Sequence, residues 1–222
     1  MVLYECRQVC FSYPHHAQPT LNGITLQLCK GEIVGLMGAN GSGKTTLTKL
    51  LIGMLRPDSG MIRLEERPLP SYTLAEIGKH VGYVFQNPSQ QLFCRSVVEE
   101  MMFYRRFAVT EIDDTVRERA NYLLDWFELA YLRNKHPLLL SRGEQQRLAI
   151  AATLMHNPRF LILDEPESAL DEQSREKLRE YMGLVASSGV GVLLVSHDRQ
   201  FCENIAHRVI KMDRGAIVNE AS

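Results

Sequence analysis

Residues 38 to 45 read Gly-Ala-Asn-Gly-Ser-Gly-Lys-Thr, and these residue types at this spacing are typical of a loop that binds phosphate groups. Glycines let the backbone curl until successive N–H groups point at phosphate oxygens, and the N-terminus of a following helix adds partial positive charge. A lysine in this position reaches the β- and γ-phosphates, and the hydroxyl next to it suits Mg²⁺. The candidate nucleotide ligands are Asn40, Gly41, Ser42, Gly43, Lys44, Thr45 and Thr46, with Thr45 also a candidate metal ligand.

The neighbouring residues form the elements that such a loop requires. Residues 33–37 are an apolar run that fits a buried strand, and residues 47–52 follow a helical pattern. The order of strand, glycine loop and helix favours a phosphate site over a glycine-rich turn without a ligand. We therefore expect the chain to bind ATP or GTP.

A second chemical element follows another apolar strand, at residues 160–163. Asp164 and Glu165 come directly after it, at the end of the strand that lies near a phosphate loop in sheets of this kind. Asp164 can hold Mg²⁺ through its water ligands, and Glu165 can accept a hydrogen bond from an attacking water. The alternative is an ordinary solvated loop. The presence of the phosphate loop in the same chain disfavours this alternative.

Composition limits the classes of protein without choosing one. The 222 residues, 45% of them hydrophobic, suffice for one domain or for one domain with an inserted subdomain. A net charge of −1 provides no basic field for nucleic acid. The five cysteines form neither a CxxC pair nor a zinc spacing, which predicts reduced thiols in a cytosolic protein. We expect no secretory signal and no membrane span, because the apolar runs are too short.

Hydrophobic periodicity predicts strands near both ends of the chain and helices in the middle. Expected strands cover residues 2–11, 24–28, 61–64, 81–85, 160–163, 192–195 and 209–212, with turns at Asn22-Gly23 and at residues 213–216, the second leading into 217–218. Expected helices cover residues 97–106, 113–127 and 142–156. This pattern indicates a nucleotide-binding core of residues 1–86 and 158–222 with a helical subdomain, 87–157, inserted into it.

Two further motifs flank the acidic strand: Leu-Ser-Arg-Gly-Glu-Gln-Gln-Arg at 140–147 and Val-Ser-His-Asp at 195–198. With these motifs the whole chain resembles the ATP-binding cassette (ABC) family of ATPases. The order of motifs in that family is matched by Tyr13, residues 38–45, Gln86, residues 141–144, Asp164-Glu165, residues 168–171 and His197. The resemblance implies an α/β P-loop fold with a RecA-like core, an N-terminal antiparallel β subdomain and an inserted α-helical subdomain.

The resemblance also implies a role for each matched residue. Glu165, His197, Gln86 and Lys44 would be catalytic, and Thr45, Gln86 and Asp164 would hold Mg²⁺. Tyr13 would stack on adenine, with a buried strand-end tyrosine as the alternative. Ser141, Gly143 and Asp171 would bind ATP held by a second ATPase subunit, so that two nucleotides lie between two chains.

The signature at 141–144 departs from the common Leu-Ser-Gly-Gly-Gln form of the family. Arg142 replaces a glycine and Glu144 replaces a glutamine. An acidic side chain in the first turn of a helix suits the helix dipole but repels phosphate, and we expect Arg142 to offset that repulsion.

The segment of residues 86–93, with the aromatic Phe-Ser-Tyr-Pro at 11–14, resembles the ATPase subunits of energy-coupling factor and cobalt or nickel importers. That resemblance implies a peripheral protein on the cytoplasmic side of the membrane, with a transmembrane coupling protein and a small substrate-capture membrane protein as partners. Candidates for the partner surface are Gln91, Leu92, Phe93 and residues 101–104, although several of these also fit a core. The competing functions are a soluble ABC nucleotide switch and the ATPase of another transporter class.

Overall fold

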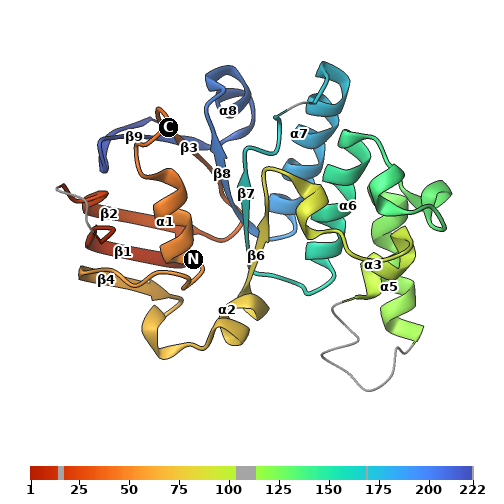
Figure 1. The fold of residues 1–222 in the computed structure, drawn as a ribbon, viewed down its shortest axis with the longest axis horizontal. Helices are drawn as coiled ribbons and strands as arrows, with labels where there is room; N and C mark the ends of the chain where they lie inside the picture. The colour runs from red at the N-terminus through yellow and green to blue at the C-terminus, as the bar shows by residue number, and fades with distance from the viewer. Residues whose placement is uncertain (15–17, 104–113, 169, 222) are drawn as a thin grey trace.

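A computed structural model describes residues 1–14, 18–103, 114–168 and 170–221 of the chain (Figure 1). Tyr104 and Ala169, which belong to predicted functional segments, and the predicted helix ends at Arg106 and Asp113 lie outside the described residues. The strands are β1 (Val2–Phe11), β2 (Leu21–Cys29), β3 (Ile33–Met37), β4 (Ser59–Leu64), β5 (Arg67–Pro68), β6 (Val81–Val84), β7 (Phe160–Asp164), β8 (Gly191–Ser196), β9 (Arg208–Asp213) and β10 (Ala216–Ala221).

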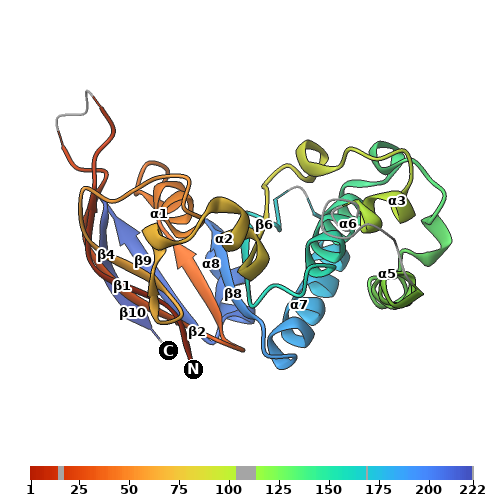
Figure 2. The ribbon, with the colours of Figure 1, turned by 90° about the horizontal axis from the view of Figure 1, so that it is seen from below.

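The described helices connect these strands. They are α1 (Lys44–Leu51), α2 (Leu74–His80), α3 (Val97–Met102), α5 (Asp114–Trp126), α6 (Arg142–Leu154), α7 (Glu172–Ser187) and α8 (Arg199–Ile205), with short 3₁₀ turns at Leu69–Ser71, Pro88–Gln91, Ala130–Leu132 and Pro137–Leu139. Figure 1 and Figure 2 show α3, α5 and α6 together at one end of the molecule, on the side of α7 that faces away from α1.

The core sheet has the strand order β10-β9-β3-β8-β7-β6 in the described part of the chain. The strands from β9 to β6 are parallel, and β10 pairs with β9 in the antiparallel direction. All six residues of β8 are buried, as expected for a parallel strand that is covered on both faces. This sheet positions the loops that carry the predicted chemistry, because each of β3, β6, β7 and β8 leads into one of them.

A second sheet, of order β2-β1-β4-β5, packs its inner face against α1. Its strands are antiparallel, and Tyr4 lies opposite Leu28 on one side and Leu64 on the other. The buried Tyr4 hydroxyl donates a hydrogen bond to the Leu51 carbonyl at 2.8 Å, which fixes the end of α1 against this sheet. Burial raises the pKa of Tyr4 well above its ordinary value, so the phenol stays a donor.

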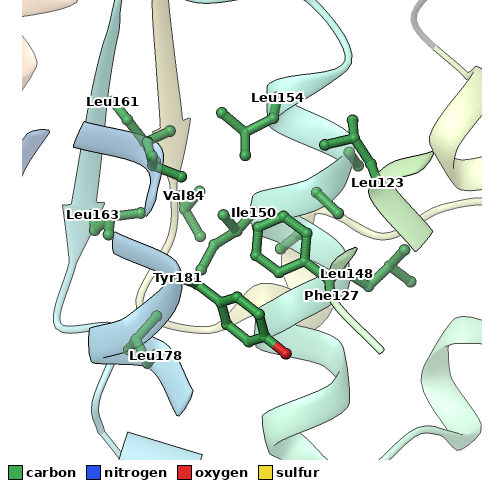
Figure 3. Packing of buried hydrophobic residues seen from close by; sticks show 14 of the residues in the cluster. Val84, Leu123, Phe127, Leu148, Ile150, Leu154, Leu161, Leu163, Leu178 and Tyr181 are labelled. Carbon is green, nitrogen blue, oxygen red and sulfur yellow. The ribbon is translucent and has the colours of Figure 1, made fainter. Parts of the chain in front are cut away.

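The group of helices packs on the core sheet through one hydrophobic cluster (Figure 3). Val84, Leu161 and Leu163 contribute from the sheet. Phe127, just after α5, is fully buried, and its ring centroid lies 4.7 Å from that of Tyr181 on α7. Phe127 therefore links α5 to the helix that covers the sheet.

The parallel core sheet and the antiparallel N-terminal sheet confirm the predicted α/β class, but one turn was wrong. Asn22 and Gly23 lie inside β2 and not in a turn, because the chain continues from Leu21 along β1. Gly23 has φ +66° at an irregularity in the pairing, which explains why a turn-forming pair fits within a strand. Helices α2, α7 and α8 were not predicted.

We expect Phe127→Ala to lower the free energy of unfolding by about 3–5 kcal/mol, because it leaves a cavity where two helices meet. Urea unfolding followed by circular dichroism measures this loss. The matched control is Tyr122→Ala on α5, where the ring is 62% exposed and the expected loss is below about 1 kcal/mol. Equal losses in the two variants would contradict a linking role for Phe127.

Candidate nucleotide-binding site

The phosphate loop connects β3 to α1 and leaves the helix N-terminus open. Gly43 caps α1 with φ +104°, and a Cβ there would lie 2.7 Å from Leu21 Cδ2, so only glycine fits. No described side chain caps this helix, and its first turn contains no acidic residue. The first N–H groups of α1 are therefore available to an anion.

Lys44 is folded back over its own loop, which keeps its ammonium group at the site. Its Nζ donates to the carbonyl of Gly38 at 2.7 Å and to that of Ala39 at 3.1 Å, and the residue is only 7% exposed. Burial lowers the pKa of Lys44 from its ordinary value, and the carboxylates of Glu165 and Asp164 oppose that shift. Lys44 is thus a partly desolvated cation close to two acidic groups.

The other predicted loop residues lie on both sides of this lysine. Asn40, Gly41 and Thr45 are exposed, whereas Ser42 and Thr46 are buried. The Ser42 hydroxyl has no hydrogen-bond partner among the described residues, although it is buried. A buried hydroxyl of this kind fits a loop that completes its hydrogen bonds with a ligand.

Tyr13 lies beside the phosphate loop. The Thr46 hydroxyl donates to the Tyr13 hydroxyl at 3.5 Å, and the Tyr13 ring packs edge-on against Phe11 with centroids 4.9 Å apart. The ring is half-buried, which leaves part of its surface available for stacking and is also compatible with a structural strand-end tyrosine.

Backbone pairing brings the predicted acidic residues level with the phosphate loop. Met37 at the end of β3 lies opposite Ser196 on β8, and Asp164 at the end of β7 lies opposite Val195. Burial raises the pKa of Asp164. The Tyr83 hydroxyl donates a hydrogen bond to Asp164 Oδ2 at 2.9 Å, which lowers this pKa but does not outweigh burial. Three strands therefore end at one edge, with a carboxylate held beside the start of the phosphate loop.

Glu165 contacts two of the other predicted catalytic residues. The Gln86 Nε2 donates to Glu165 Oε2 at 2.6 Å, and His197 Nδ1 lies 3.3 Å from Glu165 Oε1. The backbone of Glu165 has φ +45°, and its N–H donates to the Val195 carbonyl at 2.8 Å, which fixes the residue to β8. Residues from three separate loops thus meet at one carboxylate.

The signature residues form a separate group at the start of α6. Ser141 caps this helix: its Oγ accepts from the Glu144 N–H at 3.3 Å, and Glu144 Oε2 accepts from the Ser141 N–H at 2.7 Å. Burial alone would raise the pKa of Glu144, but hydrogen bonds from Ser141 and Tyr131 hold it below its ordinary value. Glu144 therefore stays ionised beside Ser141.

Gly143 and Asp171 complete this second group. A Cβ on Gly143 would lie 3.0 Å from Ser174 Oγ, and Asp171 Oδ1 accepts from the Ser174 N–H at 2.7 Å as the cap of α7. Ser141 and Gly143 also line a cavity of about 170 Å³ beside α7. No described hydrogen bond or ion pair joins this group to the residues of the phosphate loop.

Several contacts at the site could not be predicted from the motifs. The Arg142 guanidinium donates to the carbonyl of Gln86 and to the side chain of Asn87. Glu167 is buried and accepts a hydrogen bond from the Ser196 hydroxyl. Only the fold brings these residues together. The sequence did show a carboxylate two positions after Glu165, and this signal could have identified Glu167.

The predicted partner surface needs a correction. Leu92 is 5% exposed and Met101 is 1% exposed, because both pack into the cluster under the helices. Phe93 is 67% exposed, and its ring centroid lies 6.0 Å from that of Phe103. The exposed part of the predicted surface is therefore Phe93 with its neighbours, and not the whole segment.

The residues present also fit a magnesium ion that arrives with a nucleotide. Thr45, Asp164 and Gln86 offer the hard oxygen donors that Mg²⁺ prefers, and Gln86 uses its amide nitrogen for Glu165, which leaves the oxygen for a cation. The described residues contain no cluster of three or more His, Cys, Asp or Glu side chains that could hold a metal.

Comparison with known proteins agrees with this geometry. A family profile described as "ABC transporter" matches residues 21–168. The "Putative ABC transporter ATP-binding protein" of Pyrococcus furiosus is 34% identical over 97% of this chain and 82% of its own length. The "Putative HMP/thiamine import ATP-binding protein YkoD" of Bacillus subtilis is 34% identical over 90% of this chain and 36% of its own length.

A solved structure leads to the same family. That of cbiO1 from Clostridium perfringens, described as part of the ABC transporter complex cbiONQ, is 27% identical, with a TM-score of 0.92 over 99% of this chain and 88% of that one. This chain spans 28% to 34% of the length of other curated relatives. None of the helices in the described ranges is both long and apolar enough to cross a bilayer. The chain belongs to the ABC transporter family, as one of its ATP-binding members.

Proposed function

We propose that the chain hydrolyses ATP to drive a membrane importer of the energy-coupling factor type. The observation that carries this proposal is the convergence of Gln86 and His197 on Glu165 at the sheet edge where the phosphate loop begins. A nucleotide-binding module without turnover needs the loop and its lysine but does not need this cluster. The names of two similar proteins, an import ATP-binding protein and a part of a transporter complex, support the transport role.

Each residue has a task that its position suits. The N–H groups of the loop and Lys44 hold the β- and γ-phosphates, and Glu165 orients the water that attacks the γ-phosphate in line. His197 donates a hydrogen bond to the γ-phosphate and keeps Glu165 in place, and Gln86 contacts the same water. A bound Mg²⁺, held by Thr45, Asp164 and Gln86, would neutralise the charge that develops on the phosphate oxygens.

Ser141, Gly143 and Asp171 act, in this proposal, on ATP bound to a second ATPase subunit. No described hydrogen bond or ion pair joins them to the phosphate loop of their own chain, and Ser141 is exposed at the N-terminus of a 13-residue helix. The second subunit is another copy of this chain or a related one. Closure moves the helical part, residues 87–157, relative to the nucleotide-binding core.

The membrane partner binds, we propose, at Phe93 and Phe103 beside the glutamine loop, the segment of residues 85–92 that contains Gln86. The buried Glu100 carboxylate accepts from the N–H groups of Phe93 and Cys94, both at 2.8 Å, so the exposed Phe93 ring is presented on a fixed loop. Exposed aromatic side chains on a rigid support are typical of binding surfaces. The partners are a transmembrane coupling protein and a small membrane protein that captures a vitamin or a transition-metal ion.

We expect Glu165→Gln to lower ATP hydrolysis at least about a hundredfold, because the attacking water loses its acceptor. ATP binding remains, so the variant accumulates as an ATP-bound dimer that gel filtration detects. Ser141→Arg in the same background is the matched control, since it should bind ATP but stay monomeric. Full turnover by Glu165→Gln would remove Glu165 from its proposed role, and a dimer of the double variant would do the same for Ser141.

Replacing Phe93 and Phe103 with Ser should lower recovery of the membrane complex from source cells while the variant keeps its ATP affinity. Pull-down of the tagged chain in mild detergent, with mass spectrometry of what comes with it, measures this. Tyr122→Ser serves as the control because that ring is also exposed but lies on α5. Recovery of the intact complex with the double variant would contradict the proposed surface.

A further inference from the structure

Arg142 stands at the first position of α6, directly after the signature serine, and reaches back to the glutamine loop. Its Nη1 donates to Asn87 Oδ1 at 2.5 Å, and its Nη2 donates to the Gln86 carbonyl at 2.8 Å. These contacts span more than fifty positions of sequence. A glycine, which is common at this position of the signature, has no side chain that could make them.

The same loop also contacts the catalytic carboxylate. Gln86 is held by Arg142 through its carbonyl, and its side-chain amide donates to Glu165 at 2.6 Å. Glu165, Gln86 and Arg142 therefore form one continuous chain of hydrogen bonds. It begins at the proposed site of hydrolysis and ends next to Ser141.

The rest of the loop has few ways to move independently of these contacts. The Gln91 side chain accepts from the Phe85 N–H at 2.8 Å, on the residue before Gln86. Asn87 Oδ1 also accepts from the Ser89 hydroxyl at 2.8 Å, so the acceptor used by Arg142 is itself oriented. A shift of Gln86 together with Asn87 must therefore move Arg142 or break two charge-assisted hydrogen bonds.

We propose that Arg142 is a positioning residue that joins the glutamine loop to the signature, so that Gln86 and Ser141 move together. The planar guanidinium fork suits this task because two parallel donors meet a carbonyl and an amide oxygen. The inference rests on the proposed function, in which Gln86 serves this chain's own ATP and Ser141 serves the ATP of the second chain. Arg142 then connects the two nucleotide sites of the dimer.

Steady-state ATPase kinetics of the purified full chain test this role. We expect Arg142→Ala to lower kcat about tenfold, the loss typical of hydrogen bonds from a charged donor, while KM for ATP changes less than about twofold. Adding Asn87→Ala should lower kcat little further, because both changes remove one shared contact. Arg142→Lys should restore only part of the rate, since one ammonium group cannot occupy both acceptors.

Arg7→Ala is the control. Arg7 lies on β1 in the N-terminal sheet and pairs with Glu5 at 2.6 Å, and its side chain is 62% exposed, so its loss should leave kcat within about twofold. Full rescue by Arg142→Lys would show that charge alone matters and would overturn the inference. A multiplicative loss on adding Asn87→Ala would overturn it as well.

Hydrogen exchange of the peptide covering residues 85–92 separates this inference from the proposed function. We expect Arg142→Ala to speed exchange there, and Arg7→Ala to leave it unchanged, whether or not the chain hydrolyses ATP. If the unaltered chain shows no turnover but this difference in exchange appears, the proposed function fails and the positioning contact stands. If turnover is normal and exchange at 85–92 is the same in Arg142→Ala, the inference fails alone.

Discussion

The candidate site depends on the register between three parallel strands. Backbone hydrogen bonds set Met37 opposite Ser196 and Asp164 opposite Val195, so β3, β7 and β8 end at one level. A slip of one residue would turn Asp164 to the other face of the sheet. Close packing opposes such a slip: a Cβ on Gly191 would lie 2.4 Å from the Cys29 carbonyl, and one on Gly82 would lie 2.3 Å from Thr153. The register of the sheet therefore places the loops that carry Gln86, Glu165 and His197 at one edge.

The division between the phosphate loop and the signature is the second constraint on function. Lys44 and Glu165 belong to loops of the core sheet, whereas Ser141 begins a helix that packs on the sheet through side chains such as Ile150. Ser141 satisfies its cap with Glu144 in the same chain, and the N–H groups that follow stay near the surface. A site split in this way suits a protein whose activity requires two chains, which is the basis of the proposed dimer.

Local signals predicted where the candidate site residues lie in the fold better than they predicted contacts between distant segments. The phosphate loop and the carboxylates after β7 were predictable because each depends on a few neighbouring residues and a strand of uniform hydrophobicity. Gly23 was misread because a turn-forming glycine also fits a bulge inside a strand. Helix α7 was missed because its buried residues, including Leu178 and Tyr181, are spread among many charged ones. The contact from Arg142 to Gln86 joins positions far apart in sequence, and only the fold brings them together.

The burial of the Glu167 carboxyl is unfavourable, but its hydrogen bond with Ser196 helps to hold the loop that contains His197. Burial raises the pKa of this carboxyl above its ordinary value of 4.5, so its ionised form costs stability, and the cost grows as the pH rises from that value. In return, the Ser196 hydroxyl donates to Glu167 and accepts from the Asp198 N–H at 2.9 Å. These bonds hold the residues on both sides of His197. A hydrophobic residue at position 167 would remove the cost of burial, but it would leave Ser196 without its acceptor and the histidine loop less firmly placed beside Glu165.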